Sequence, residues 1–162
     1  MNESTRRDIE RLVRRASATS YGFEGRFLVR AAPSPQHPIV EADRLLTDVG
    51  YRPLGTGWSP VSWWDGTAIL ARMLHGTLFR GQKLVSAPKA RTLAEKFADA
   101  FAFDESSVCL TNLRWESGQF PHGLSGSPPS FSWGDVSEAT FDAGIVCFGR
   151  GKAGLVWIEQ TD

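Results

Sequence analysis

Residues 138–162 read EATFDAGIVCFGRGKAGLVWIEQTD and contain two apolar runs, at residues 143–148 and 153–158. Together the runs hold Val, Ile, Phe and Trp, and the four residues GRGK at 149–152 join them. Apolar runs of β-forming residues, joined by a short glycine-containing linker, predict a β-hairpin. We expect this hairpin to form the centre of a sheet, with most of its aromatic side chains in the core.

Charged residues mark the two ends of this hairpin. Glu138 and Asp142 precede the first run, while Glu159 and Asp162 follow the second. The outer ends of antiparallel strands lie side by side, so we expect negative charge at the open end of the hairpin. We expect the basic residues of the linker, Arg150 and Lys152, at the other end.

The whole chain has a formal net charge of zero, but the charge is unevenly distributed. Residues 1–103 carry 15 Lys and Arg against 10 Asp and Glu, whereas residues 104–162 carry 3 against 8. The acidic half would suit a basic partner. Salt bridges along helix faces could equally absorb the asymmetry.

The fold class follows from the order of the elements. A chain of 162 residues is long enough to bury one core, so we expect a single domain over residues 1–162. Apolar periodicity and capping residues predict helices at residues 4–18, 39–49, 62–76 and from Pro88 to about 101. Further strands are expected at residues 26–30, 77–80 and 107–115. Helices dominate to residue 103 and strands after it, which predicts an α+β fold: a mainly antiparallel sheet with helices packed on one face.

No group of residues specifies a reaction. Cys109 and Cys147 stand within apolar sequence, as core thiols do, and neither belongs to a CxxC motif. His37, His75 and His122 suit structural or surface roles, and no histidine pair has the spacing of metal ligands on a helix. We therefore expect no enzyme activity, no cofactor and no metal site.

One enzymatic alternative comes from residues 78–81, LFRG. They resemble the arginine strand of ADP-ribosyltransferases, which use an Arg, then a strand with Ser or Thr, then a Glu. The corresponding residues would be Arg80, Ser107 and Glu159. The paired catalytic Glu motif is missing at 159–161, EQT, and the first gap is short. A further alternative is a subunit of a larger cytosolic assembly.

A second resemblance is carried by SWGD at 132–135, ATFDAGI at 139–145 and GLVWIE at 154–159. These segments are similar to the ending of small bacterial proteins from toxin–immunity systems, over about thirty residues at the C-terminus. Those relatives end in a denser acidic cluster, which Gln160 and Thr161 interrupt here. The resemblance implies an immunity-type protein that neutralises a cognate toxin by covering its active site.

The expected contact surface combines carboxylates, which would steer a basic partner, with aromatic anchors. Its residues are Asp135, Glu138, Asp142, Glu159 and Asp162, with Trp133 and Phe131 as anchors. Phe131 and Trp133 belong to the longest irregular stretch, residues 116–133, and such long loops are often functional.

The expected partner is a cognate toxin with a basic, nuclease-like domain, and neither a membrane nor a nucleic acid is expected as a partner. The first residues, MNESTRRDIERLVRR, lack the apolar segment of a secretory signal. Two cysteines without such a signal are typical of reduced cytosolic thiols, so we expect a cytoplasmic protein. The sequence leaves the oligomeric state open.

Overall fold

The computed structural model describes residues 1–19, 23–33, 35–76, 83–101, 107–112, 139 and 141–161. Within these residues the chain forms α1 (Glu3–Thr19), β1 (Phe23–Ala31), α2 (Pro38–Asp48), the 3-10 helix η1 (Gly55–Gly57), β2 (Ser59–Pro60), α3 (Trp63–His75), α4 (Ala87–Ala98), β3 (Val108–Thr111), β4 (Phe141–Gly149) and β5 (Lys152–Gln160). The α+β class with an antiparallel sheet is confirmed. The strand expected at 77–80 and the loop at 116–133 lie outside the described residues.

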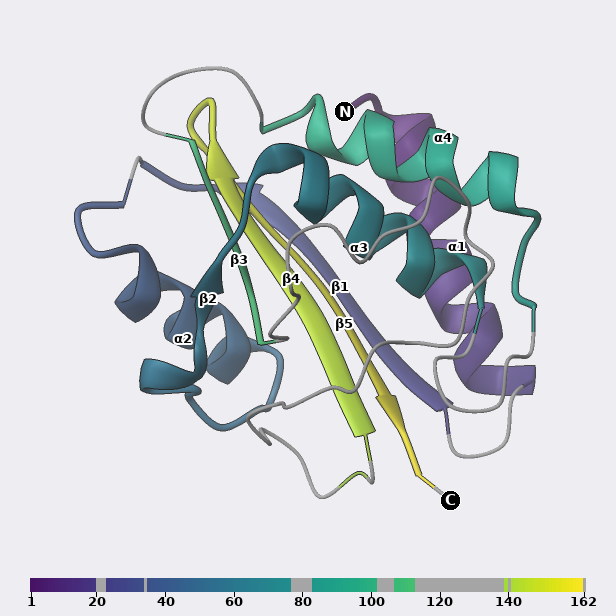
Figure 1. Ribbon diagram of the computed structural model, residues 1–162, viewed down its shortest axis with the longest axis horizontal. Helices are drawn as coiled ribbons and strands as arrows, with labels where there is room; N and C mark the ends of the chain where they lie inside the picture. The colour runs from purple at the N-terminus through teal and green to yellow at the C-terminus, as the bar shows by residue number, and fades with distance from the viewer. Residues whose placement is uncertain are drawn as a thin grey trace.

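The β4–β5 hairpin lies at the centre of the sheet, as its sequence predicts. The strand order is β1-β5-β4-β3-β2 and all four neighbouring pairs are antiparallel (Figure 1). Gly149 pairs with Lys152, so the turn has only two residues, Arg150 and Gly151. Their φ angles are +51° and +68°, the left-handed values of a type I′ turn, whose twist matches that of the flanking strands.

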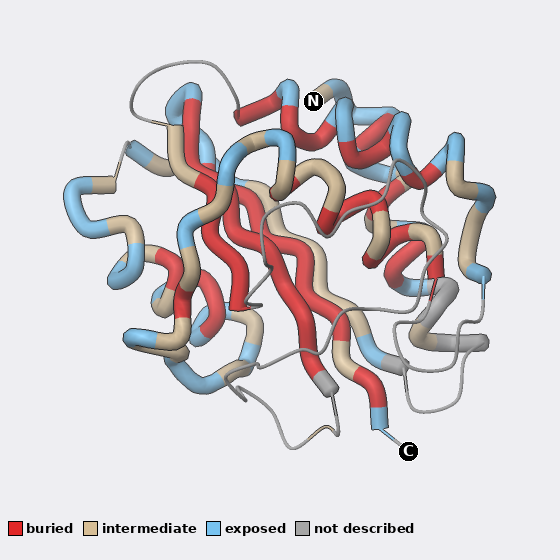
Figure 2. Tube along the Cα trace, in the orientation of Figure 1, coloured by how far each residue is buried: buried red, intermediate tan, exposed pale blue. Residues whose placement is uncertain are grey.

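The two central strands are buried on both faces (Figure 2). On one face Ile145, Val156 and Ile158 pack against the apolar stripes of α1, α3 and α4. On the other face Val146, Leu155 and Trp157 pack against α2 and the segment that follows it. Alternate residues of each strand therefore belong to two separate cores, as the two-residue repeat of a strand requires.

The expectation that the helices cover one face holds for α1, α3 and α4 but is wrong for α2. Ala42, Leu45 and Leu46 of α2 are buried in the same core as Trp157, on the opposite face (Figure 1). The physical reason lies in β5, where every residue from Ala153 to Ile158 is buried. A strand that is apolar on both sides needs cover on both sides.

Polar side chains cap the first turns of α1 and α3. Asn2 caps α1 by accepting a hydrogen bond from the Thr5 amide at 2.9 Å, so the helix begins slightly before the expected residue 4. Ser62 caps α3, as expected, by accepting from the Asp65 amide at 3.1 Å. Along α1, Arg7, Arg11 and Arg14 pair with acidic residues three or four positions earlier, as in the Arg7–Glu3 bridge of 3.2 Å. Such bridges absorb part of the basic charge of the N-terminal half.

Candidate functional site

Three carboxylates form a row across three neighbouring strands at the open end of the hairpin. Glu159 of β5 lies directly opposite Asp142 of β4 on one side and Glu24 of β1 on the other. Residues in register on adjacent strands point to the same face. We call Glu24, Glu159 and Asp142 the acidic row. The predicted juxtaposition of Asp142 and Glu159 is confirmed, whereas Glu24 was missed, because its place depends on how β1 pairs with β5.

Asp142 is the buried end of this row. Only 1% of the surface of Asp142 is exposed. The Asn112 amide nitrogen donates to the Asp142 carboxylate at 2.8 Å and to the Asp142 carbonyl at 3.2 Å. The Asn112 amide oxygen accepts from the Gly144 amide at 2.9 Å. Asp142 thus joins β4 to the end of β3, and its carboxylate is not on the surface where a partner could touch it.

Glu159 and Glu24 face a different environment on the same side of the sheet. The Tyr51 hydroxyl donates a hydrogen bond to Glu159, which is partly exposed. Burial, and then the hydrogen bond to Glu159, raise the pKa of Tyr51 above its usual value. Arg26 bonds Glu24 at 2.9 Å, and its guanidinium carbon lies 5.9 Å from the centre of the Tyr51 ring. One cation therefore offsets part of the negative charge of the acidic row.

The other predicted contact residues, Phe131, Trp133, Asp135, Glu138 and Asp162, lie outside the described residues. Arg80 of the ADP-ribosyltransferase alternative does too. Ser107 and Glu159 of that alternative are not brought together. Ser107 lies beside Gly149 at the turn end of the hairpin, where its hydroxyl donates to the Phe101 carbonyl at 3.0 Å. Glu159 lies opposite Asp142. Asp142 is seven residues before Gly149 on β4, which corresponds to roughly 20 Å along the strand.

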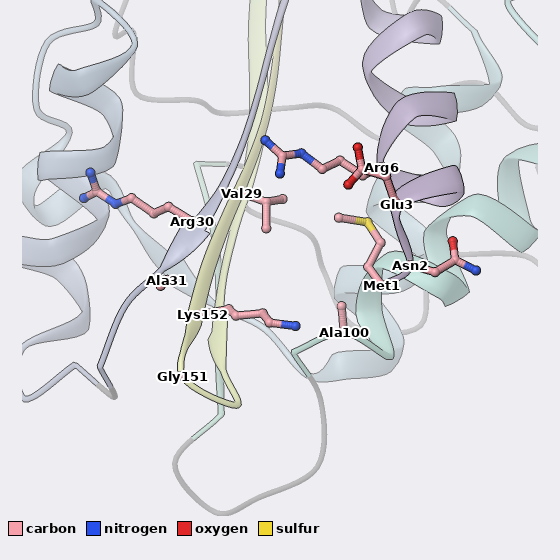
Figure 3. Close-up of a pocket in the computed structure, with 10 residues that line it drawn as sticks. All are labelled: Met1, Asn2, Glu3, Arg6, Val29, Arg30, Ala31, Ala100, Gly151 and Lys152. Carbon is pink, nitrogen blue, oxygen red and sulfur yellow. The ribbon is translucent and has the colours of Figure 1, made fainter.

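The opposite end of the sheet is basic. A cavity of about 270 Å³ lies between the start of α1, the end of β1 and the β4–β5 turn (Figure 3). Lys152 reaches toward α1 and Arg6 reaches toward β1, whereas Arg30 extends to the other side of β1 and pairs there with Asp48. Within the described part of the chain neither Arg6 nor Lys152 has an ion-pair partner.

The charge of this basic end affects its neighbours. Burial, followed by the nearby charges of Lys152 and Arg150, lowers the pKa of the Met1 amino group. The predicted separation of charge along the hairpin is therefore confirmed, with basic residues at the turn and carboxylates at the open end. Arg6 was missed because only the packing of α1 against β1 brings it to this end.

The thiols and histidines do not form a nucleophilic site in the described residues. Cys109 and Cys147 are 2% and 1% exposed, as expected of core residues, and their sulfur atoms lie 3.4 Å apart. His75 uses Nδ1 in a 2.8 Å contact with the Val85 carbonyl, and His37 is exposed. In the described residues no group of three or more His, Cys, Asp or Glu is placed to hold a metal ion.

Comparison of the chain with family models, with curated proteins and with solved structures gave no match in any of the three. Among the described residues, none of the helices has both the length and the apolar character needed to cross a membrane.

Proposed function

We propose that this chain is a non-enzymatic binding protein of the immunity type, which neutralises a cognate bacterial toxin by covering the toxin's active site in the cytoplasm. The observation that carries the proposal is the acidic row, which places Glu24, Glu159 and Asp142 side by side on three strands. The partner that suits it is a basic protein, such as a nuclease whose active site binds phosphates.

The three carboxylates of the acidic row differ in exposure and therefore in their proposed roles. Glu24 is well exposed, with 61% of its side-chain surface accessible, and Glu159 is partly exposed. These two carboxylates can meet a basic surface, while Asp142 holds β3 and β4 together beneath them. Asp142 also lies near the start of β4, and Asp135 and Glu138 precede it by seven and four residues in the sequence.

Electrostatic complementarity acts mainly on the rate at which two proteins meet. A row of carboxylates at a sheet end would raise the association rate with a basic partner, most strongly at low salt. Exposed aromatic residues would add the desolvated contact that slows dissociation. Trp133 and Phe131 are proposed for this role on their sequence position alone.

The decisive test is co-expression of this chain with the product of the neighbouring open reading frame. The proposal expects that product to be toxic alone, harmless with this chain, and recovered with it as a stable complex. If no neighbouring product is toxic or co-purifies, the proposed function is wrong.

The role of the acidic row is tested on that complex by Glu24→Lys and Glu159→Lys. Each should slow association about tenfold or more at 0.01 M salt, where the screening length is about 30 Å, and much less at 1 M, where it is about 3 Å. Glu95→Lys is the matched control, because Glu95 is an exposed carboxylate on α4, on the other face of the sheet. Equal effects of all three reversals would exclude the acidic row as the contact.

A further inference from the structure

The two cysteines of the chain face each other across neighbouring strands. Cys109 of β3 is the register partner of Cys147 of β4, and their sulfur atoms are 3.4 Å apart. Both thiols are free. They are 38 residues apart in the sequence, so the pairing is a product of the fold.

The backbone places this pair at a position where a disulfide fits. The Cys109 carbonyl accepts a hydrogen bond from the Val61 amide at 3.0 Å, so the backbone polar groups of Cys109 face β2 and not β4. Cys109 and Cys147 are therefore a non-hydrogen-bonded pair of the β3–β4 ladder. Such pairs have Cα atoms about 4.5 Å apart, within the range of about 4.4–6.8 Å found across disulfides.

Helix α3 packs closely on this pair. Gly66 of α3 packs on the thiols, and a Cβ atom at that position would lie 2.5 Å from the Cys109 sulfur. A side chain there would push Cys109 out of its place. Disulfide formation draws the two sulfur atoms toward each other, from 3.4 Å to about 2.05 Å.

We propose that Cys109 and Cys147 are an oxidisable dithiol, which a small peroxide converts into a disulfide that fastens β3 to β4. One thiolate attacks a peroxide oxygen, which breaks the O–O bond and leaves a sulfenic acid and hydroxide. The second thiol then displaces the sulfenic hydroxyl group as water and forms the S–S bond. With hydrogen peroxide, two thiols lose two hydrogen atoms and the oxidant leaves as two molecules of water.

The route to the buried thiols is the short edge of the sheet. β3 has four residues, and the strand outside it, β2, has two. Short edge pairings open more readily than the centre of a sheet. Burial also raises the pKa of Cys147, which keeps its thiol protonated, so the reactive thiolate forms during such openings.

The disulfide would join the two ends of the segment that is proposed to contact a partner. The loop that it closes, residues 110–146, includes Phe131, Trp133, Asp135, Glu138 and Asp142. A cross-link at its base keeps the two ends of this segment together during any opening of the edge. The chemistry of the pair does not depend on the proposed function, so either can fail without the other.

The experiment treats the native protein with hydrogen peroxide, blocks remaining thiols with N-ethylmaleimide, and measures the intact mass. We expect loss of both reactive thiols in one step, a monomer lighter by two hydrogen atoms, recovery with dithiothreitol, and a higher urea midpoint for the oxidised form. Retention of both thiols in the folded protein, oxidation to sulfinic or sulfonic acid, or a disulfide between two chains would overturn the proposal.

Dimedone, which traps sulfenic acids, tests the proximity of the second thiol. The wild type should give no adduct, because Cys147 or Cys109 closes the disulfide first. Cys147→Ser should give an adduct at Cys109. A stable adduct on the wild-type protein would show that the second thiol does not reach the first. If the variant does not fold, the wild-type mass and dimedone measurements decide the question alone.

Discussion

The ring of Trp157 occupies the space directly over Gly144, its register partner on β4. A Cβ atom at position 144 would lie 1.7 Å from Cε3 of this ring. Trp157 is fully buried, and its Nε1 finds no hydrogen-bond partner in the described structure, so packing alone fixes the ring. Tyr51 and Trp58 cover it from α2's side, with ring centres 5.8 and 6.0 Å away.

Gly144→Ala should therefore lower the free energy of unfolding by about 3 kcal/mol, because the added methyl group must displace a buried indole. Urea unfolding followed by tryptophan fluorescence measures the change. In a Trp157→Leu background the same substitution should cost much less, because the ring is gone, and the double-mutant cycle gives the coupling. An unchanged cost in that background would show that the ring is not what excludes a side chain.

Asp43 of α2 accepts hydrogen bonds from several groups of the segment 54–58, which helps to cover Trp157. Its Oδ1 accepts hydrogen bonds from the Leu54 amide and from Trp58 Nε1, each at 2.8 Å, and the Gly55 amide lies within 3.2 Å. Asp43→Ala removes the acceptor for all of these donors and should cost about 2 kcal/mol of unfolding free energy. Asp43→Asn keeps one acceptor oxygen and should cost less.

The control for this prediction is Asp48→Ala on the same helix. Asp48 pairs with Arg30 at the surface, with 46% of its side chain accessible, and exposed pairs contribute about 0–1 kcal/mol. Denaturant unfolding of the three variants gives the ranking. A loss for Asp48→Ala equal to that for Asp43→Ala would contradict the role assigned to Asp43.

The hairpin and the antiparallel sheet were predictable because their signals are local. The residues of 149–152 suit a tight turn, and the runs on either side have the composition of strands. The position of α2 was not predicted, because an amphipathic stripe shows that a helix packs on something but not on which face. The uninterrupted apolar run of β5 was the available signal that both faces need cover.

The candidate site was predictable only in part. Asp142 and Glu159 come together through the hairpin, which is local. Glu24 joins them through a strand pairing with more than 130 residues between the partners, and Asn112 reaches Asp142 only because β3 lies beside β4. No local pattern distinguishes a carboxylate that will be buried by such a partner from one that stays exposed. Asp142 was therefore expected as a contact residue, and the structure places it in the interior.

Asn112→Asp tests the buried end of the acidic row. The new carboxylate would replace a donor to Asp142 with a second negative charge in a site that is 1% exposed. At neutral pH this should cost about 3 kcal/mol of unfolding free energy. A neighbouring like charge raises the pKa of a carboxyl group, so protonation at mildly acidic pH should remove part of the penalty.

Asn112→Ala is the matched control, because it loses the same hydrogen bonds without adding a charge. Unfolding is measured by urea titration at pH 7 and at about pH 4.5, near the ordinary carboxyl pKa values. The difference between the two variants should shrink as the pH falls. A difference that stays constant would mean that repulsion with Asp142 is not its cause.

The hydrogen bond from Tyr51 to Glu159 predicts how stability changes at alkaline pH. The pKa of Tyr51 is raised in the folded protein, first by burial and then by Glu159, whereas in the unfolded chain it is about 10. The neutral hydroxyl therefore stabilises the fold fully below about pH 10, and this contribution is lost as the pH rises above that value. Tyr51→Phe should cost about 1–2 kcal/mol near pH 8, and its deficit relative to the wild type should narrow as the pH rises toward 11.

Comparing the wild type with Tyr51→Phe isolates this group from the lysines that titrate in the same range, because both proteins contain them. Glu159→Gln separates the two causes of the raised pKa, since it keeps a hydrogen-bond acceptor and removes the charge. The ionisation of Tyr51 in the folded protein, followed by tyrosinate absorbance in alkaline solution, should begin at a lower pH in that variant than in the wild type, and still above the ordinary tyrosine pKa, because burial, the larger cause, is unchanged. If tyrosinate absorbance rises at the same pH in Glu159→Gln and in the wild type, the charge of Glu159 does not contribute to the raised pKa.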